Sequence, residues 1–542
     1  MSKSAATSDA PKGGMQKFLD VVERVGNRVP HPAVIFLLLL AAVIGLSQIL
    51  YMTGASVEYE VMVPQPTEAQ VEITDPMYYG MGSLPGYASL DEQKITIETR
   101  TATARSLLTI EGLRFMYTSL IPNFMAFTAV GLIIVAMLGV GVAEESGLIK
   151  ALIRKLVVIA PPKLLVYIMV FVGILSSIAA DAGYLVLIPL AGAAFLSVGR
   201  HPLAGLAAGF AAVAGAFTVN MLIKPLDAVL VEFTNDAIHL VDPDTSIGLA
   251  SNLWFSVVSV LFLTIVIALI TERVIEPRLG KFEGERTDEG SASLSKEEWR
   301  GLKFAGIGLV GVLAFFALLA LPSGAPLRDP SSGALIGNTP FMNGLIAFIA
   351  AVFFVCGFAY GLGSGAMKNF RDAIKAMEKA VATLGSLIFL LFIIAQFIAF
   401  FNYSNMATIL AVSLSNALTG VDIGPLWLLL GFIAVVVLLD FIITGAIAKW
   451  AIFAPIFVPL LMRLGVEPEA VLAAYRVADS PINMITPLNA YFALVVVFCQ
   501  KYDKNAGVGT VVALMLPYVV VLLALWTILF VVWHLLGLPW GI

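Results

Sequence analysis

Apolar runs of about 20 residues recur along the whole chain, and each is long enough to cross a hydrocarbon core of about 30 Å as a helix. The first run extends from Ala33 to Met52. Of the 542 residues, 59% are hydrophobic and only 13% are charged. A water-soluble domain has too small an interior for so much apolar surface. The sequence therefore predicts an all-α polytopic membrane protein.

The distribution of charge predicts how the chain is oriented. Residues 1–32 contain five basic side chains, so the positive-inside rule places this N-terminus in the cytoplasm. The first apolar run lacks a small-residue cleavage site and is interpreted as a retained anchor. Residues 53–112 are rich in acidic side chains and are expected to form an extracytoplasmic segment. A net charge of -5 offers no basic surface, so no nucleic-acid partner is expected.

Two interrupted apolar stretches predict re-entrant hairpins. Lys163 and Arg200 are both expected in the cytoplasm, yet the segment between them, at about 164–199, is apolar and broken at SSIAADAGY. Two half-length stretches can enter and return where irregular backbone is buried in protein. A second stretch, at about 425–462, is broken near DFIITGAIAKW. With about nine transmembrane helices beside these hairpins, the predicted organisation is that of a secondary transporter.

The predicted halves are separated by a charged segment. The first half covers residues 33–271, the cytoplasmic linker 272–303, and the second half 304–542. Three pairs of stretches recur in the same order in the two halves. They are SIAADAGYLVLIPLAG with GAIAKWAIFAPIFVPLL, HPLAGLAAGF with EPEAVLAAYR, and VNMLIKPLDA with INMITPLNA. Because the first copy is expected to enter from inside and the second from outside, we expect inverted repeats around a site near the midplane.

Polar side chains at membrane depth are candidates for transport, because inserting a charge costs about 2.5–3.5 kcal/mol. Arg476 would bind a carboxylate through bidentate hydrogen bonds, and Trp450 would stack on an aromatic ring. Asp181 or Asp479 would take up the coupling proton or sodium ion. The candidates for substrate binding are Trp450, Pro468, Arg476, Asn483 and Pro487, and those for ion coupling are Asp181, Asn220 and Asp479. A coupling sodium ion would bind near Asp479 and Asn483.

Structural interpretations stand beside these functional ones. Arg476 and Asp479 are three residues apart and could form a salt bridge within one helix, and Trp450 could be a packing or interface aromatic. The favoured interpretation of Asp440, Lys224 and Asp227 is that each lies close enough to a surface to be solvated.

Other classes of protein fit less well. The two cysteines and four histidines form no metal or nucleophile motif, so no enzyme and no cofactor are expected. Hairpins that close a midplane site from opposite sides suit a gated carrier better than a passive channel.

Four stretches resemble the p-aminobenzoyl-glutamate transporter (AbgT) family of the ion transporter superfamily: VGNRVPHPAVIF, SSIAADAGYLVLIPL, AKWAIFAPIFVPL and YRVADSPINMITPLNAYF. The resemblance covers nearly the whole chain. It implies a homodimer of nine-span protomers in the bacterial inner membrane. It also implies import of p-aminobenzoyl-glutamate, or antiporter-like export of sulfonamide antibiotics with drug resistance as the result, driven by a proton or sodium gradient. The alternative is a sodium-coupled di- or tricarboxylate symporter of the same superfamily.

The resemblance also assigns residues. The first-hairpin aspartate of the family matches Asp181 and the second-hairpin tryptophan matches Trp450. The proline, arginine, aspartate and proline that follow match Pro468, Arg476, Asp479 and Pro487. Family members often have a serine three residues before the tryptophan, where this chain has Ile447. The resemblance therefore implies the same site with one polar substrate contact missing.

Overall fold

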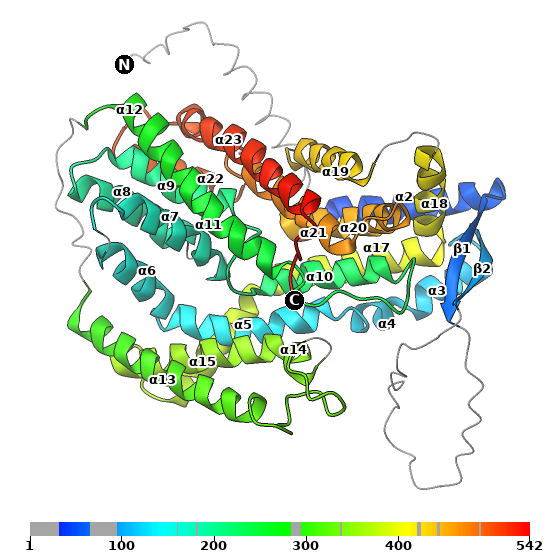
Figure 1. The fold of residues 1–542 in the computed structure, drawn as a ribbon, viewed down its shortest axis with the longest axis horizontal. Helices are drawn as coiled ribbons and strands as arrows, with labels where there is room; N and C mark the ends of the chain where they lie inside the picture. Colours follow the sequence, from blue (N-terminus) through cyan, green and yellow to red (C-terminus); the bar gives the residue numbers. More distant parts are fainter. Residues whose placement is uncertain are drawn as a thin grey trace, which may run out of the picture.

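A computed structural model describes residues 32–64, 95–159, 161–179, 183–282, 294–336, 339–419, 424–441, 445–486 and 489–542. The described part is mostly helical, and many of its helices run lengthwise through one bundle (Figure 1). The prediction of a mainly helical membrane protein is therefore confirmed.

Within the described ranges, seven helices are long and apolar enough to span a membrane. One of them combines α11 with a π-helical turn and the short α12. The seven are α2 (Pro32–Met52), α11 to α12 (Leu253–Leu279), α13 (Lys296–Ala320), α15 (Leu345–Ser364), α17 (Gly385–Tyr403), α20 (Ala446–Arg463) and α23 (Val508–Leu535). The expected total of about nine spans stays a prediction.

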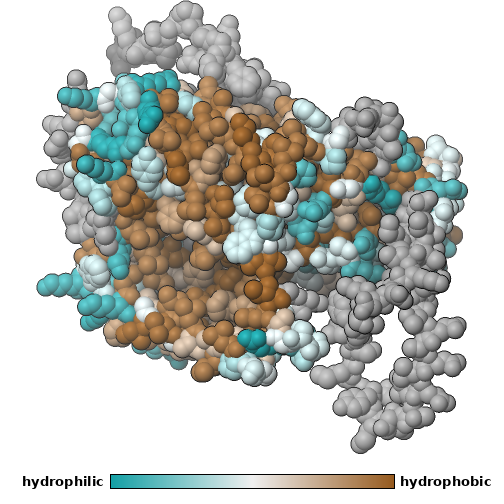
Figure 2. Space-filling view, viewed as in Figure 1, coloured by the Kyte–Doolittle hydropathy of each residue, from teal (hydrophilic) through white to brown (hydrophobic). Residues whose placement is uncertain are grey.

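Apolar and hydrophilic side chains are distributed over the surface of the bundle as expected for a protein in a bilayer. Apolar side chains cover the middle of the face that includes α11, α13 and α23, whereas hydrophilic side chains gather at the end near α12 (Figure 2). On α13, apolar side chains such as Ile307 and Val310 are 71% and 69% exposed. Such exposure is favourable in lipid and unfavourable in water.

One part of the described chain is not helical, and here the all-α expectation is wrong. Strand β1 (Ser56–Pro64) pairs antiparallel with β2 (Ile95–Thr103), with Ser56 opposite Thr103 and Pro64 opposite Ile95. Both strands contain β-branched residues alternating with polar ones, a period that suits a strand and not a helix. The pair lies at one end of the bundle, within the segment 53–112 that was expected outside the membrane (Figure 1).

The expected span Tyr117–Val140 is divided. Helices α3 (Ile110–Thr118) and α4 (Leu120–Met125) precede α5 (Ala129–Glu145), and α6 (Leu148–Ile159) follows at an angle of 61° to α5. Gly147 forms this bend with φ +87°, a conformation that favours glycine. The remaining helices outside the central region are α14 (Pro340–Asn343), α16 (Phe370–Thr383) and α18 (Met406–Thr419).

Short helices separated by irregular backbone form the centre of the bundle. They are α7 (Leu165–Leu175), α8 (Ile188–Ser197), α9 (Pro202–Gly215), α10 (Pro225–Ile238), α19 (Pro425–Asp440), α21 (Pro468–Ile482) and α22 (Phe492–Gln500). Helices α9 and α21 each begin with proline after an extended residue, and each ends at an irregular segment. Their likeness agrees with the sequence pairing, while the re-entrant hairpins and the inversion of the repeats stay predictions.

Close packing of α5 against α15 depends on glycine. A Cβ atom on Gly139 of α5 would lie 2.0 Å from the carbonyl oxygen of Ala350, and one on Gly357 of α15 would lie 2.6 Å from the backbone of Ala143. Small residues allow helix backbones to approach closely in membranes, where van der Waals packing drives association. Gly131, two turns earlier on α5, has no atom within 4 Å of its Cβ position.

These two positions give a matched test of the packing. We expect Gly139→Ala to lower the thermal unfolding temperature in detergent, because overpacking costs about 1–3 kcal/mol. Gly131→Ala should leave it unchanged or raise it, because alanine favours a helix over glycine by about 1 kcal/mol. Equal unfolding temperatures for the two variants would contradict the packing described.

Candidate functional site

At the centre of the bundle, the irregular segment of residues 216–224, which joins α9 to α10, contacts the C-terminal half of α21; this contact is called the crossing. The backbone N–H of Thr218 donates to the hydroxyl of Ser480 at 3.1 Å, and the Thr218 hydroxyl donates to the carbonyl of Arg476 at 2.9 Å. Irregular backbone at membrane depth is tolerated only where protein or a cavity surrounds it. The crossing joins the first half of the chain to the second.

Arg476 of α21 is bound by groups from the first half. Its Nη1 donates to Asp227 Oδ1 and to the carbonyl of Thr218, both at 2.6 Å, and its Nε donates to Asn252 Oδ1 at 3.2 Å. The side chain is 3% exposed. Asp227 Oδ2 also accepts the backbone N–H of Lys224 at 2.9 Å, which fixes the start of α10. The alternative of a salt bridge between Arg476 and Asp479 is therefore wrong, because the arginine pairs across to α10.

Asp479 instead belongs to a buried triad of charges, defined here as Asp440, Lys449 and Asp479. The ammonium of Lys449 lies 2.6 Å from Asp479 Oδ1 and also donates to Asp440 Oδ1. All three side chains are 0% exposed. Asp479 Oδ1 additionally accepts the hydroxyl of Tyr475 at 2.9 Å. One cation thus joins two carboxylates from α19 and α21.

Asn483 lies beside this triad. Its amide donates to the backbone carbonyl of Asp479 at 3.0 Å and approaches Asp479 Oδ2 at 3.5 Å. A sodium ion bound at Asp479 Oδ1 would have to replace the ammonium of Lys449. The described ranges contain no group of three or more histidine, cysteine and acidic side chains that could hold a metal.

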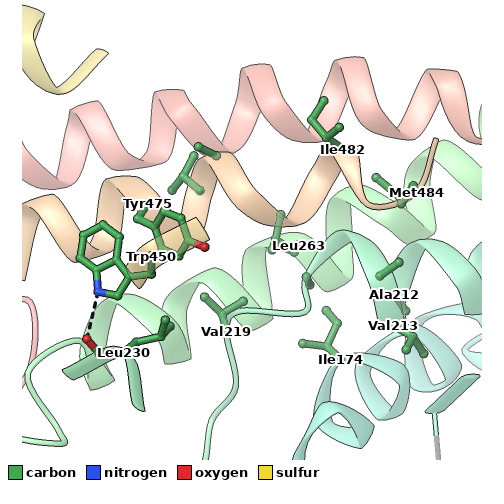
Figure 3. Packing of buried hydrophobic residues seen from close by; sticks show 14 of the residues in the cluster. Ile174, Ala212, Val213, Val219, Leu230, Leu263, Trp450, Tyr475, Ile482 and Met484 are labelled. Carbon is green, nitrogen blue, oxygen red and sulfur yellow. Dashed lines mark hydrogen bonds between the residues drawn. The ribbon is translucent and has the colours of Figure 1, made fainter. Parts of the chain in front are cut away.

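Trp450 follows Lys449 on α20 and packs inside the protein. Its indole N–H donates to the carbonyl of Leu230 at 3.0 Å and to the Thr234 hydroxyl at 3.1 Å, as Figure 3 shows for Leu230. The ring centroid lies 4.5 Å from that of Tyr475, and the side chain is 0% exposed. In this state Trp450 is a packing residue between α10 and α21.

The other candidates are dispersed. Asn220 donates to the carbonyl of Leu175 at 3.1 Å and to the Ser177 hydroxyl at 3.0 Å, so it joins the end of α7 to the central crossing. Pro468 begins α21 about 12 Å from Arg476 along the helix axis, because a helix rises 1.5 Å per residue. The structure therefore does not bring Pro468 to the arginine. Asp181 and Pro487 lie outside the described residues.

Three residues expected near a surface are buried. Asp440 is 0% exposed, Lys224 1% and Asp227 7%, so the solvated interpretation is wrong. Each lies at a helix end, which normally signals a membrane surface. Here the helices end inside the bundle, where Lys224 donates to the Ser177 hydroxyl at 3.2 Å. The sequence alone assigns no role to Lys449, although a charged residue beside an interrupted apolar run is the signal that could have found it.

A cavity of about 1240 Å³ opens next to these groups. Its wall includes Ala228 and Ser251, which directly follow Asp227 and precede Asn252 in the chain. The chain neighbours of the arginine's two side-chain partners therefore line the cavity.

Comparison with known proteins gives consistent matches over the whole chain. The model of the AbgT putative transporter family matches residues 17–542. The p-aminobenzoyl-glutamate transport protein of Escherichia coli (strain K12) is 32% identical over 541 residues, covering 100% of this chain and 98% of the relative.

Two solved structures are also similar. The YdaH transporter of Alcanivorax borkumensis has a TM-score of 0.82 at 39% identity, covering 95% of this chain and 100% of that one. MtrF of Neisseria gonorrhoeae, described with a class of antimetabolite efflux pumps, has a TM-score of 0.82 at 35% identity, covering 95% and 97%.

The pairing of Arg476 with Asp227 predicts a large effect on stability. Asp227→Asn should lower the unfolding temperature of the detergent-solubilised protein, because leaving a buried charge without its partner costs about 3–5 kcal/mol. The matched control is Glu232→Gln, which changes a partly exposed carboxylate on the same helix and should have little effect. Similar unfolding temperatures for the two variants would contradict the ion pair.

Proposed function

The chain belongs to the AbgT transporter family, whose members are transporters and not enzymes, and from this premise we propose that it is a secondary active transporter of p-aminobenzoyl-glutamate in the bacterial inner membrane. The observation that carries the proposal is the buried pairing of Arg476 with one internal carboxylate, Asp227, whose chain neighbour Ala228 lines a cavity. A ligand with carboxylates and an aromatic ring has groups for both the arginine and the nearby aromatic side chains.

Binding would proceed by exchange at Arg476. A carboxylate of the ligand replaces Asp227, so the guanidinium stays neutralised throughout. The exchange keeps the arginine paired, and the released Asp227 carboxylate, whose side chain is 11% exposed, keeps the backbone N–H of Lys224 as a partner. Asn252 and the carbonyl of Thr218 continue to hold the guanidinium during the replacement. Because the internal partner must be displaced, the arginine favours an anionic ligand over a neutral one.

Trp450 would contribute after a movement of α20. In the structure its ring is fully buried against Tyr475. A small displacement of α20 would separate the two rings and allow an aromatic ligand ring to stack between them or beside them. Movement of elements around a central site is the general basis of alternating access.

Coupling is proposed to use a proton. The region around Asp479 already holds a cation, the ammonium of Lys449, and a proton on a carboxylate changes the charge of the triad without displacing that ammonium. Asp181 and Asn220 stay proposed coupling residues of the first half, together with Asp479 in the second. Sodium coupling is the alternative that the transport experiment distinguishes.

Several finer features belong to the same proposal. They are the inverted repeats, the two re-entrant hairpins, the homodimer, the cytoplasmic N-terminus and a nine-span protomer. Export of sulfonamide-like antimetabolites is the second candidate function, because MtrF, of the antimetabolite efflux class, is similar over 95% of this chain. A di- or tricarboxylate symporter is not favoured, since the relatives match the AbgT family over the full length.

Uptake of radiolabelled p-aminobenzoyl-glutamate into proteoliposomes, under separate proton and sodium gradients, tests the proposal. We expect gradient-dependent uptake by the wild type and a loss of about 10- to 100-fold in kcat/KM for Arg476→Ala, because a hydrogen bond to a charged group contributes about 1.5–3 kcal/mol. Arg154→Ala, which changes a half-exposed ion pair with Glu298, is the control and should transport normally.

Two results would contradict the proposal. Absence of p-aminobenzoyl-glutamate uptake under either gradient would remove the substrate assignment, and sulfonamides would then be the next ligands to measure. Equal kcat/KM for the Arg476 and Arg154 variants would show that the arginine does not bind the transported ligand.

A further inference from the structure

The triad of Asp440, Lys449 and Asp479 joins three helices by charge. Asp440 is the last residue of α19, Lys449 lies in the first turn of α20, and Asp479 lies in the last turn of α21. The ammonium contacts one oxygen of each carboxylate. Because all three side chains are 0% exposed, bulk water does not screen their charges.

The triad carries an excess of negative charge. When all three groups are ionised, two carboxylates face one ammonium and the sum is one negative charge. An uncompensated charge in a buried, apolar position is strongly unfavourable, and such a group neutralises instead. One bound proton makes the sum zero without moving any helix. The triad is therefore built to hold a proton in the state that the structure describes.

The two carboxylates are not equivalent. Asp479 Oδ1 is bound by Lys449 and Tyr475, and its Oδ2 faces the Asn483 amide. Asp440 Oδ2 is buried and has no hydrogen-bond partner within the described ranges. An ionised carboxylate oxygen without a donor is costly, whereas a protonated one is neutral. The free oxygen of Asp440 is thus where a proton would bind.

The charged and titratable groups that face Asp440 come from the two helices packed against α19. They are Lys449 of α20 and Tyr475 and Asp479 of α21. The hydroxyl of Tyr475 is already directed to Asp479 and to the carbonyl of Ala446, so it does not supply a proton to Asp440. Arg476 pairs with Asp227, and the buried ammonium of Lys224 interacts with Asp227 and Asp479 and not with Asp440.

We propose that Asp440 binds the coupling proton, and that the protonation state of Asp440 controls, through Lys449, how firmly α19 is attached to α20. This inference rests on the proposed transport function, and within the second half it places the proton on Asp440, with Asp479 acting by holding Lys449. A proton from hydronium in the aqueous phase binds to Asp440 Oδ2: one O–H bond forms on the carboxylate, one O–H bond of the hydronium breaks to leave water, and the charge of the triad changes from one negative to zero. Neutral Asp440 holds the ammonium less strongly, so Lys449 stays with Asp479 and α19 separates more easily from α20.

The position of Lys449 links this step to the ligand. Trp450 is its neighbour in the chain and packs between α10 and Tyr475. A change in the attachment of α19 to the first turn of α20 therefore acts on the helix that must move before Trp450 can meet a ligand. Proton binding and ligand access would therefore both depend on movement of α20.

The Asp440→Asn variant should still exchange the ligand across the membrane but should no longer couple this movement to protons. The amide keeps the shape of the side chain, and the remaining Lys449 and Asp479 sum to zero charge, so the variant is expected to fold. In proteoliposomes we expect exchange of external labelled for internal unlabelled p-aminobenzoyl-glutamate, without any gradient, at a rate within about twofold of wild type. Under an imposed pH gradient, the ratio of internal to external p-aminobenzoyl-glutamate should fall to one. Proton movement that depends on the substrate, measured with a pH dye trapped inside the vesicles, should vanish.

Asp372→Asn, at a partly exposed carboxylate near the start of α16, is the matched control and should keep both activities. If Asp440→Asn is not recovered folded, Asp440→Leu replaces it with the same expectation, because it also leaves the triad neutral.

Each outcome has a defined meaning. Exchange without accumulation in the Asp440 variant supports the proposal. Accumulation and proton movement equal to those of the wild type would overturn it, as would a wild-type protein driven by sodium alone. Failure of the wild type to exchange p-aminobenzoyl-glutamate would instead contradict the proposed function. Acid–base titration of purified wild type and Asp440→Asn, which needs no substrate, then decides whether Asp440 binds a proton in the physiological pH range.

Discussion

Compensation of buried charge is the constraint on which the centre of this protein depends. Arg476 is neutralised by Asp227 of α10, and Lys449 by Asp440 and Asp479 of α19 and α21. The first pair joins residues 249 apart in the sequence, whereas the triad joins three successive helices, so both help to determine which short helices lie together. Removing one member would leave a charge in a medium where it is strongly unfavourable. The irregular segments around α9 and α21 persist because these contacts satisfy their backbone.

A ligand can use such a network only by replacing one of its members. Asp227 is the natural member to leave, because its side chain is 11% exposed and its neighbour Ala228 lines the cavity. The triad around Lys449 is instead fully enclosed, so a proton is better suited to it than a larger ion. Substrate and coupling ion would therefore act on two adjacent networks that meet on α21, where Arg476 and Asp479 are three residues apart. A change in either network therefore alters the contacts of the same short helix, α21.

Much of the fold followed from the sequence, because the length and spacing of apolar runs report directly on helices in a bilayer. The sequence also placed Arg476, Asp479 and Trp450 at the breaks. It could not give their partners, since Arg476 and Asp227 are 249 residues apart and are brought together only by the crossing of the two broken helices. For the same reason the prediction that Asp440, Lys224 and Asp227 lie near a surface is wrong. The strands at 56–64 and 95–103 were missed because their alternating pattern lies in a segment interpreted only by its charge.

The most direct test of the account is a cryo-electron microscopy structure of the full chain bound to p-aminobenzoyl-glutamate. The account predicts a ligand carboxylate within hydrogen-bond distance of the Arg476 guanidinium, with Asp227 separated from it and Asn252 still in contact. A structure in which Arg476 remains paired with Asp227 while the ligand lies elsewhere would contradict the central claim that the ligand enters by exchange of carboxylates.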